Sequence, residues 1–349
     1  MNFDKVRIGY VPCSSKLNLP GDRRRFCYYA SKRGIKFEIA KPSENYDIVI
    51  VTQKGDLSTW SKYRKGKARI VYDFIDSYLA IPRYDLKGIF RGLAKYVSGE
   101  SRYLQLSYRK AIEAMCKRAD AVICSTAEQQ EKVLEFCNNV HVILDFHGSV
   151  VQKVKQNYSS GDVFNFVWEG LPYNIRSLYE INDVLMKLNM KKKIVLHIVT
   201  DLKYYKYMGK YGHQRTSELT NKLFCNVCLH EWNEKTCSDI ISQCDLAVIP
   251  IPLNDPLSAG KPENKLLLFW RMGMPVVVSA TAAYARAMQL SGLSMACRTK
   301  NEWLEVLEKY IIDENARRDA GQRGRVFCEN NYSEEKTLEL WDEVFRSLV

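Results

Sequence analysis

The chain lacks any long hydrophobic run. No stretch of its 349 residues approaches the roughly 18 consecutive apolar residues that a helix needs to cross a bilayer. The N-terminus, MNFDKVRIGYV, has neither the apolar core nor the small-residue cleavage site of a secretory signal. The composition, 46% hydrophobic and 26% charged, excludes disorder and fibre, and the length predicts two globular domains. We therefore expect a cytoplasmic protein.

Cysteines arranged for disulfides or metals are also scarce. The 11 cysteines are scattered singly on apolar segments, which is typical of buried thiols in a reducing compartment. One C-x-x-C stands at Cys225–Cys228, near His230 and Cys237, but no second C-x-x-C follows. The first three of these side chains lie on or beside a predicted strand, whose alternation is expected to send them to opposite faces. The sequence predicts no metal site.

Several catalytic motifs are absent. The chain has no G-x-S-x-G elbow, no phosphate-binding G-x-x-x-x-G-K-[ST] loop, no G-x-G-x-x-G fingerprint and no H-x-x-x-H pair. These absences argue against a serine hydrolase, a P-loop nucleotidase and a histidine-based metalloenzyme. Among the five histidines, only His147 follows a predicted strand at a position that could face a cleft.

Positive charge is abundant and unevenly distributed. The 52 Lys and Arg exceed the 40 Asp and Glu by 12. Residues 1–150 hold 26 basic and 16 acidic side chains, whereas residues 151–349 hold 26 and 24. Such a field attracts anionic partners, although a merely solvated surface is the alternative. Since no nucleic-acid recognition motif accompanies the charge, we expect no nucleic-acid partner.

A basic segment within the first half is a candidate membrane contact. Within residues 81–110, cations recur at four-residue steps, at Arg83, Lys87, Arg91 and Lys95. Apolar side chains lie between them. A helix of this kind can lie in the headgroup region of an anionic membrane. An ordinary surface helix of a basic domain is the equal alternative.

Hydrophobic periodicity predicts an α/β domain over residues 1–150. Short β-rich runs stand at 6–12, 36–40, 47–52, 69–74, 121–126 and 140–146, and helical patterns at 101–117 and 127–137. The strands lack polar alternation, which indicates a parallel sheet covered on both faces. This is a Rossmann-like pattern.

The same pattern restarts after a polar linker at 148–161. Strands are expected at 164–169, 193–200, 226–231, 245–251, 275–280 and 294–299, and helices near 174–188, 234–243, 262–272 and 301–312. A second Rossmann-like domain thus covers 161–330. The amphipathic segment 331–349 is expected to return as a helix to the N-terminal domain.

Ligands of open α/β sheets bind at the carboxyl ends of the strands, so the loops there supply the candidate residues. After the first strand, Pro20-Gly21 makes a turn, and Asp22 can cap a helix whose first turn carries Arg23, Arg24 and Arg25, a candidate anion site. Asp73 and Asp76 follow a buried strand. Asp73 can be structural, whereas Asp76, further into the loop, can orient or deprotonate a substrate hydroxyl.

Two loops of the second half are sharper candidates. In VWEGLPYNIR, Gly170 follows a strand and precedes Asn174 and Arg176. The segment LSAGKPENKLL opens a helix with a proline near its first position, where free amides and two cations can meet a diphosphate. Its candidate residues are Gly260, Lys261, Glu263, Asn264 and Lys265.

The order of these elements, with NKLLLFWRMGMPVVVS and a tryptophan-containing final helix, resembles the GT-B-fold glycosyltransferases, most closely the retaining family 4 group. The resemblance covers nearly the whole chain. It implies two Rossmann-like domains facing across a cleft, with the last helix packing back across them. It further implies a nucleotide-sugar donor held by the C-terminal domain, an acceptor held by the N-terminal domain, and no metal or other cofactor.

The resemblance assigns roles to individual residues. Lys265 matches the family lysine that stabilises the departing diphosphate, and Gly170 matches the glycine after the first donor-domain strand. Lys261 and Arg176 are nearby cations by inference. Thr200, Asp201 and Trp232 stand where the family holds the nucleobase.

One departure concerns the family E-x7-E pair, whose positions are Gly260 and Leu268 here. The second glutamate of that pair binds the donor ribose in the family. Glu263, at the opposite end of the same helix, is a candidate replacement for it.

The sequence thus favours a metal-independent glycosyltransferase that uses a nucleotide-diphosphate sugar. The expected product is a cell-envelope polysaccharide, lipopolysaccharide or glycolipid, with a peripheral position at the inner membrane face as a further expectation. Lys265 and Lys261 would neutralise the leaving diphosphate, and Asp76 or His147 would orient the acceptor. Two alternatives stay open: a non-catalytic GT-B module that binds a glycan, nucleotide or protein, and a sugar-nucleotide epimerase.

Overall fold

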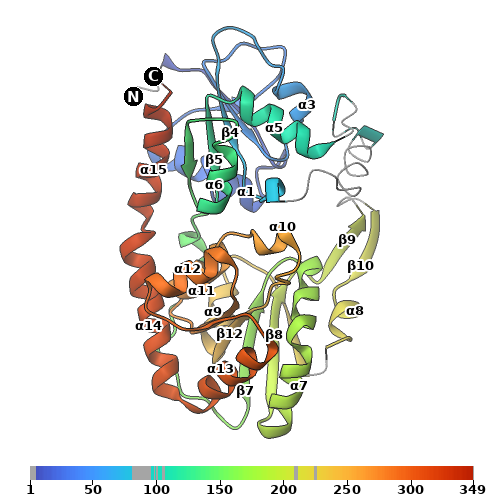
Figure 1. The fold of residues 1–349 in the computed structure, drawn as a ribbon, viewed down its shortest axis with the longest axis vertical. Coiled ribbons are helices and arrows are strands. Elements are labelled where there is room, and N and C mark those ends of the chain that lie inside the picture. The colour runs from blue at the N-terminus through green and yellow to red at the C-terminus, as the bar shows by residue number, and fades with distance from the viewer. Residues whose placement is uncertain are drawn as a thin grey trace. The chain divides into compact units, whose positions relative to one another are not determined.

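The structure, a computed structural model, describes residues 5–80, 96, 97, 99, 101–103, 107–207, 211–223 and 226–348. The chain divides into two compact units. The first comprises Met1–Phe146, Gly260–Pro262 and Glu334–Val349, and the second comprises His147–Ala259 and Glu263–Ser333. Figure 1 shows that both combine a sheet with helices. The basic segment at 81–95 lies outside the described residues.

The first unit contains a six-stranded parallel sheet. Its strands are β1 (Ile8–Val11), β2 (Glu38–Ile39), β3 (Ile48–Thr52), β4 (Arg69–Asp73), β5 (Ala121–Cys124) and β6 (Val140–Val142). Its helices are α1 (Pro20–Arg23), α2 (Phe26–Arg33), α3 (Leu57–Trp60), α5 (Tyr108–Arg118), α6 (Ala127–Val133) and α15 (Glu334–Arg346), with a 3-10 turn at η2 (Tyr78–Ala80). The strand order is β2-β1-β3-β4-β5-β6.

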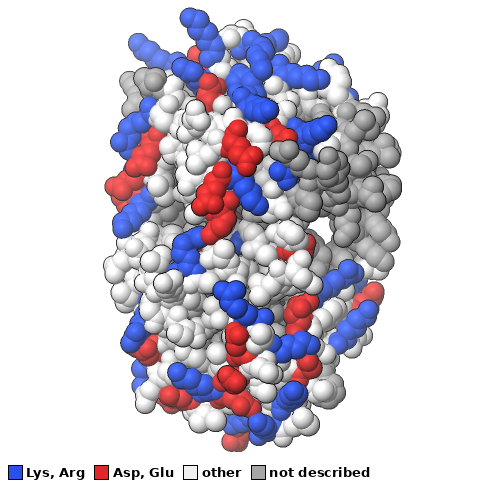
Figure 2. Space-filling view, in the orientation of Figure 1, with Lys and Arg blue, Asp and Glu red and all other residues white. Residues whose placement is uncertain are grey.

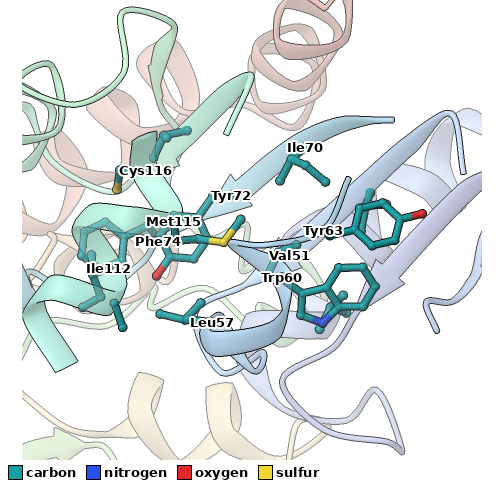
Figure 3. Packing of buried hydrophobic residues seen from close by; sticks show 14 of the residues in the cluster. Val51, Leu57, Trp60, Tyr63, Ile70, Tyr72, Phe74, Ile112, Met115 and Cys116 are labelled. Carbon is teal, nitrogen blue, oxygen red and sulfur yellow. The ribbon is translucent and has the colours of Figure 1, made fainter. Parts of the chain in front are cut away.

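Both faces of this sheet are buried, as its continuous apolar strands predict. In β4, Ile70 and Tyr72 join one apolar cluster, while Val71 between them joins the other. Figure 3 shows the first cluster, in which side chains of α5 lie beside Tyr72 of β4, while Trp60 of α3 packs on Tyr63. Alternate residues of one strand therefore build two cores.

Helix α15 belongs to the second of these cores. Trp341 and Phe345 pack against Tyr29 of α2, with ring centroids 5.6 and 5.5 Å apart. The Tyr29 hydroxyl donates to Asp342 at 2.8 Å, and Arg33 pairs with the same carboxylate at 2.7 Å. The C-terminal helix is thus an integral part of the first unit.

The second unit contains another six-stranded parallel sheet, in the order β11-β8-β7-β12-β13-β14. Its strands are β7 (Phe164–Glu169), β8 (Ile194–Thr200), β11 (Asn226–Glu231), β12 (Leu246–Ile249), β13 (Val276–Ser279) and β14 (Ala296–Cys297). The helices are α7 (Asn182–Lys191), α8 (Ser217–Thr220), α9 (Cys237–Gln243), α10 (Pro256–Ala259), α11 (Asn264–Arg271), α12 (Ala282–Leu290), α13 (Lys300–Ile312) and α14 (Glu314–Asn331). Two 3-10 segments, η3 (Gly148–Val150) and η4 (Pro172–Ile181), complete it.

Helix α14 packs closely on α11 because two glycines remove side chains from the contact. A Cβ at Gly321 would lie 2.2 Å from the Gly273 carbonyl oxygen, and one at Gly324 would lie 2.3 Å from the Trp270 ring. Larger residues at either position would push α14 away. The packing fixes α11, the helix that carries the candidate Lys265.

The two parallel sheets confirm the expected α/β class, and four local features differ from the expectations. An antiparallel hairpin of β9 (Lys203–Tyr207) and β10 (Tyr211–Arg215) follows β8, and helix α12 follows β13. The helix expected near 174–188 begins as the 3-10 segment η4, and the one expected at 101–117 begins only at Tyr108. Among helices in the described ranges, none combines the length and apolar character that crossing a bilayer requires.

Candidate functional site

The strand order of the second unit indicates where a ligand would bind. The chain leaves β7 for β8 on one side and later crosses to β12 on the other side, so the order reverses between β7 and β12. Open α/β sheets bind ligands at the carboxyl ends of strands beside such a reversal. Gly170 follows β7 directly, and the loop after β12 leads through α10 to α11. Both candidate loops of the second half therefore begin at this edge of the sheet.

The side chain of Lys265 lies at the end of β7. Its Nζ donates to the Glu169 carbonyl oxygen at 2.6 Å and lies 4.7 Å from the centroid of the Trp168 ring. A Cβ at Gly170 would approach this Nζ to 2.1 Å. Glycine at 170 therefore creates the space that the ammonium group occupies, and the two residues that the resemblance singled out are in direct contact.

Trp168 is a contact that the sequence analysis did not predict. It is buried, and its ring faces the Lys265 ammonium at a distance typical of a cation–π interaction. The contact holds the charge at the strand end, beside a neutral ring and a carbonyl oxygen. A partly desolvated cation in such a position can attract a phosphate group strongly.

A carboxylate, that of Glu263, lies at the N-terminus of α11, two residues before Lys265. Glu263 is the N-cap residue of α11 and is 4% exposed. Its Oε1 lies 3.9 Å from the Arg286 guanidinium. Asn264, the first residue of the helix, is half-buried. Leu268, at the position of the family ribose-binding glutamate, lies in the core and is 1% exposed.

The ends of β8 and β11 place three more candidates at the same edge. Thr200 pairs with Glu231 across the two strands, and its carbonyl oxygen accepts from the Trp232 amide at 2.9 Å. Among described residues, the fully buried Thr200 hydroxyl has no hydrogen-bond partner. Burial, together with the nearby Glu231 and Glu169 charges, raises the pKa of Asp201. This corner therefore offers polar groups that could contact a nucleoside.

The η4 segment carries Asn174 and Arg176. Asn174 is half-buried, whereas Arg176 is exposed. Their 3-10 conformation replaces the helix start that the sequence predicted. The chain therefore continues after Gly170 into a 3-10 segment that begins at Pro172, instead of into an α-helix.

In the first unit, Asp22 does not cap the helix that follows it. Its side chain is buried and accepts from the Tyr10 hydroxyl at 2.8 Å and from the Cys13 and Ser14 amides at 2.7 and 3.1 Å. The cap prediction is wrong, because Asp22 lies inside α1 and turns back to the loop after β1. Gly21 approaches the same loop closely, since a Cβ there would lie 2.8 Å from the Cys13 sulfur.

The three arginines after Asp22 have different surroundings. Arg23 and Arg24 are half-buried, and Arg25 is buried. Arg25 pairs with Asp73 at 2.6 Å and with Asp145 at 3.1 Å, and it donates to the Ile143 carbonyl oxygen. Asp73 therefore has the structural role allowed for it. The sequence placed Arg25 in a candidate anion site but did not predict its carboxylate partners, because they lie 48 and 120 residues away in the same chain.

Asp76 is held by Gln53. The Gln53 amide donates to the Asp76 carboxylate at 2.8 Å, while its oxygen accepts from the Asp76 backbone amide at 2.7 Å. Burial raises the pKa of Asp76, and the Lys261 charge partly offsets this effect. The neighbouring Ser77 hydroxyl donates to the Gly260 carbonyl oxygen at 2.6 Å. Gly260 and Lys261 are thus assigned to the first unit together with Asp76.

His147 lies in the second unit, immediately before the η3 turn, and is buried. The candidate residues consequently form two groups. Gly170, Thr200, Trp232, Glu263 and Lys265 lie in the second unit, and Gly21, Asp22, Asp76 and Lys261 in the first.

The charge distribution agrees with the sequence count. On the face drawn in Figure 2, lysine and arginine side chains gather at the top of the view, on the first unit. Charges of both signs are interspersed over the second unit. The excess of cationic side chains therefore reaches this face of the first unit.

No protein-family model matches the chain, and no curated protein matches it either. Solved structures do resemble it. A variant of S. aureus TarM, in complex with fondaparinux, alpha-GlcNAc-glycerol and UDP, aligns with a TM-score of 0.59 at 16% identity and covers 94% of this chain. The chain spans 58% of the length of TarM.

Two further structures align over nearly their whole length. Anabaena HepE in complex with UDP has a TM-score of 0.62 at 11% identity, covering 98% of this chain and 100% of its own. A glycosyltransferase from Rickettsia africae ESF-5 has a TM-score of 0.61 at 10% identity, covering 99% of each chain. At these identities the likeness shows the fold alone, and this fold is the GT-B type expected from the sequence.

Proposed function

We propose that the protein is a glycosyltransferase that moves a sugar from a nucleotide-diphosphate donor to an acceptor hydroxyl. The contact between Lys265 and the Gly170 backbone, at the strand reversal of the second unit, carries the proposal. It places a cation at a strand end where a phosphate can bind. That HepE and TarM were solved with UDP, and that the R. africae structure is of a glycosyltransferase, supports a nucleotide-sugar donor.

The transfer would proceed by attack of the acceptor oxygen on the anomeric carbon. The bond from that carbon to the diphosphate oxygen breaks, and the nucleoside diphosphate leaves. Lys265 would stabilise the charge that develops on the diphosphate, which is an electrostatic task that needs no metal ion. Lys261 and Arg176 are proposed as further cations near the leaving group. The proton of the acceptor hydroxyl would pass to Asp76 or to a diphosphate oxygen.

Donor recognition would involve the corner formed by β8 and β11. We propose that Thr200 and Trp232 contact the nucleoside and that Glu263 replaces the missing ribose-binding glutamate. The aliphatic Leu268 cannot accept a hydrogen bond from a ribose hydroxyl. Retention of the anomeric configuration is also proposed, on the resemblance to family 4.

The acceptor is proposed to be a growing cell-envelope glycan or glycolipid. The cationic surface of the first unit supports a position at an anionic membrane face. Sedimentation with vesicles that contain anionic lipid, at low and high salt, tests this placement. Binding that is equal to neutral and anionic vesicles would contradict it.

The first test is a panel of UDP-, GDP-, ADP- and dTDP-sugars, with and without EDTA, read by thermal shift and donor hydrolysis. One donor should raise the melting temperature and be hydrolysed slowly despite EDTA. NMR of the recovered sugar would detect epimerisation, the activity of the second alternative. The burial of Leu268 favours the other alternative, a non-catalytic module, which predicts nucleotide-sugar binding without turnover on any acceptor.

A further inference from the structure

Three side chains with metal-binding atoms meet on one face of the second sheet. They are His197 of β8 and Cys228 and His230 of β11. Cys228 pairs directly with His197 across the strands, and His230 lies two residues further along the same strand. Strand alternation therefore places Cys228 and His230 on the same face, rather than on opposite faces. The ring nitrogens and the sulfur all lie within 4.8 Å of one another.

A polar chain behind the cluster orients the first imidazole. The Asn165 backbone amide and side-chain amide donate to Asp245 at 2.7 and 3.4 Å, so the Asn165 side-chain oxygen is directed to His197. This oxygen lies 3.1 Å from His197 Nε2. His197 Nε2 thus carries the proton, and its Nδ1 lone pair is directed to His230 Nε2, 2.9 Å away. Metal-ligating histidines are commonly fixed by such an outer partner.

The surroundings suit a ligand set rather than a sealed core. All three residues are half-buried, so an ion can reach them. Burial lowers the pKa of both imidazoles and favours the neutral form that binds metals. The nearby Cys244 thiol is different, because burial raises its pKa to about 12 and keeps it protonated. Cys228, rather than Cys244, is the cysteine whose sulfur lies within 4.8 Å of the two ring nitrogens.

We propose that His197 Nδ1, His230 Nε2 and Cys228 Sγ bind one zinc-class divalent cation, with a water molecule as the fourth ligand. Two nitrogens and one sulfur are a donor set that zinc favours. Binding releases the thiol proton of Cys228, and the proton between the two imidazoles moves to His230 Nδ1. No electron transfer is involved.

Metal binding requires the two imidazoles to rotate, because their rings are nearly parallel, at 12°, and His197 Nδ1 faces His230 Nε2 at 2.9 Å. With bond lengths of about 2.0–2.3 Å, ligand atoms on one tetrahedral zinc stand about 3.3–3.7 Å apart. The two ring nitrogens, 2.9 Å apart, must therefore separate slightly, and the sulfur, within 4.8 Å of them, must approach by at most about 1 Å. The ion would join the edge strand β11 to β8, and it would thereby steady the strand end that carries Trp232.

The test uses metal-free protein titrated with Co²⁺, whose spectrum reports thiolate ligation directly. We expect one equivalent to bind with a thiolate-to-cobalt charge-transfer band and strong four-coordinate ligand-field bands, both displaced by Zn²⁺. Cys228→Ser should abolish the charge-transfer band. His197→Ala and His230→Ala should each weaken binding at least about tenfold. Cys137→Ser and His213→Gln are the matched controls and should bind like the parent.

Melting curves separate a metal site from a purely structural histidine pair. Zn²⁺ should raise the melting temperature of the parent and not that of Cys228→Ser, a nearly isosteric change. Absence of the charge-transfer band, its survival in Cys228→Ser, or its loss only in Cys225→Ser would each overturn the assignment. None of these readouts uses glycosyl transfer, so failure of the proposed function leaves the result interpretable.

Discussion

The Lys265 ammonium occupies the space that a side chain at Gly170 would need, since a Cβ there would lie 2.1 Å from Nζ. This relationship explains why a glycine follows β7 and why the lysine can reach the strand end. Gly170→Ala should displace the ammonium and reduce turnover about tenfold or more, with a smaller effect on stability. Steady-state kinetics with the donor identified by the panel would measure it.

Gly161→Ala is the control, because a Cβ at Gly161 meets nothing within 4 Å. This variant should retain the parent rate. Equal rates for both variants would show that the position of the ammonium does not matter for turnover.

Lys265→Ala should reduce turnover about 10²–10³-fold, because the charge that develops on the diphosphate would lose its cation. The fold should persist, since the lysine is half-buried and α11 is held by other core residues. Lys300→Ala, which removes an exposed lysine paired with Asp183, is the control. Unchanged turnover in Lys265→Ala, measured with saturating donor, would remove Lys265 from the site.

Asp73→Asn should destabilise the protein by about 3–5 kcal/mol, because it leaves the Arg25 charge buried with weaker compensation. Both side chains of this ion pair are fully buried. Urea unfolding followed by circular dichroism would give the free-energy change. Asp319→Asn weakens the exposed contact with Arg323 and should cost about 0–1 kcal/mol. Similar losses in the two variants would show that burial does not govern the strength of these pairs.

The pH dependence of turnover should report Asp76. Burial raises its pKa above the ordinary value of 3.8. Since a carboxyl can accept a proton only when ionised, the rate should rise with pH through a midpoint above 3.8. Asp76→Asn should lower the rate and remove this acidic limb. An unchanged limb in the variant would assign the titration to another group.

The pH dependence of stability that Asp76 contributes has the opposite sign to the pH dependence of turnover. A carboxyl with a raised pKa in the folded state binds its proton more tightly there than in the unfolded chain. The contribution of Asp76 to stability is therefore complete below pH 3.8 and is lost as the pH rises through its folded pKa. In Asp76→Asn, the stability near neutral pH should be equal to or greater than that of the parent. Urea unfolding at several pH values would check this.

Removal of the C-terminal aromatic contacts should destabilise the first unit. Trp341→Ala should cost about 3–5 kcal/mol, because Trp341 is buried against Tyr29 and Phe26. Leu340→Ala, on a more exposed side of the same helix, is the control and should change the unfolding free energy little. A similar loss in both variants would contradict the packing of Trp341 as the source of the effect.

The sequence by itself determined the α/β class and most of the sheet. Runs such as Ile48–Thr52 and Val276–Ser279 are apolar without alternation, which is possible only where both faces of a strand are covered. The local pattern also located Gly170 and Lys265, since each stands at a strand or helix end that a single segment reveals. Periodicity did not reveal the β9–β10 hairpin, because its strands, KYYKY and YGHQR, show no alternation of apolar and polar residues.

Only the tertiary structure decided which side chains meet. Arg25 joins Asp73 and Asp145, and His197 joins His230, because neighbouring strands bring together residues far apart in the chain. Asp22 turns back to the loop after β1 instead of capping a helix, since two backbone amides of that loop donate to its carboxylate. Such choices depend on distances across the sheet, and a one-dimensional pattern does not contain them.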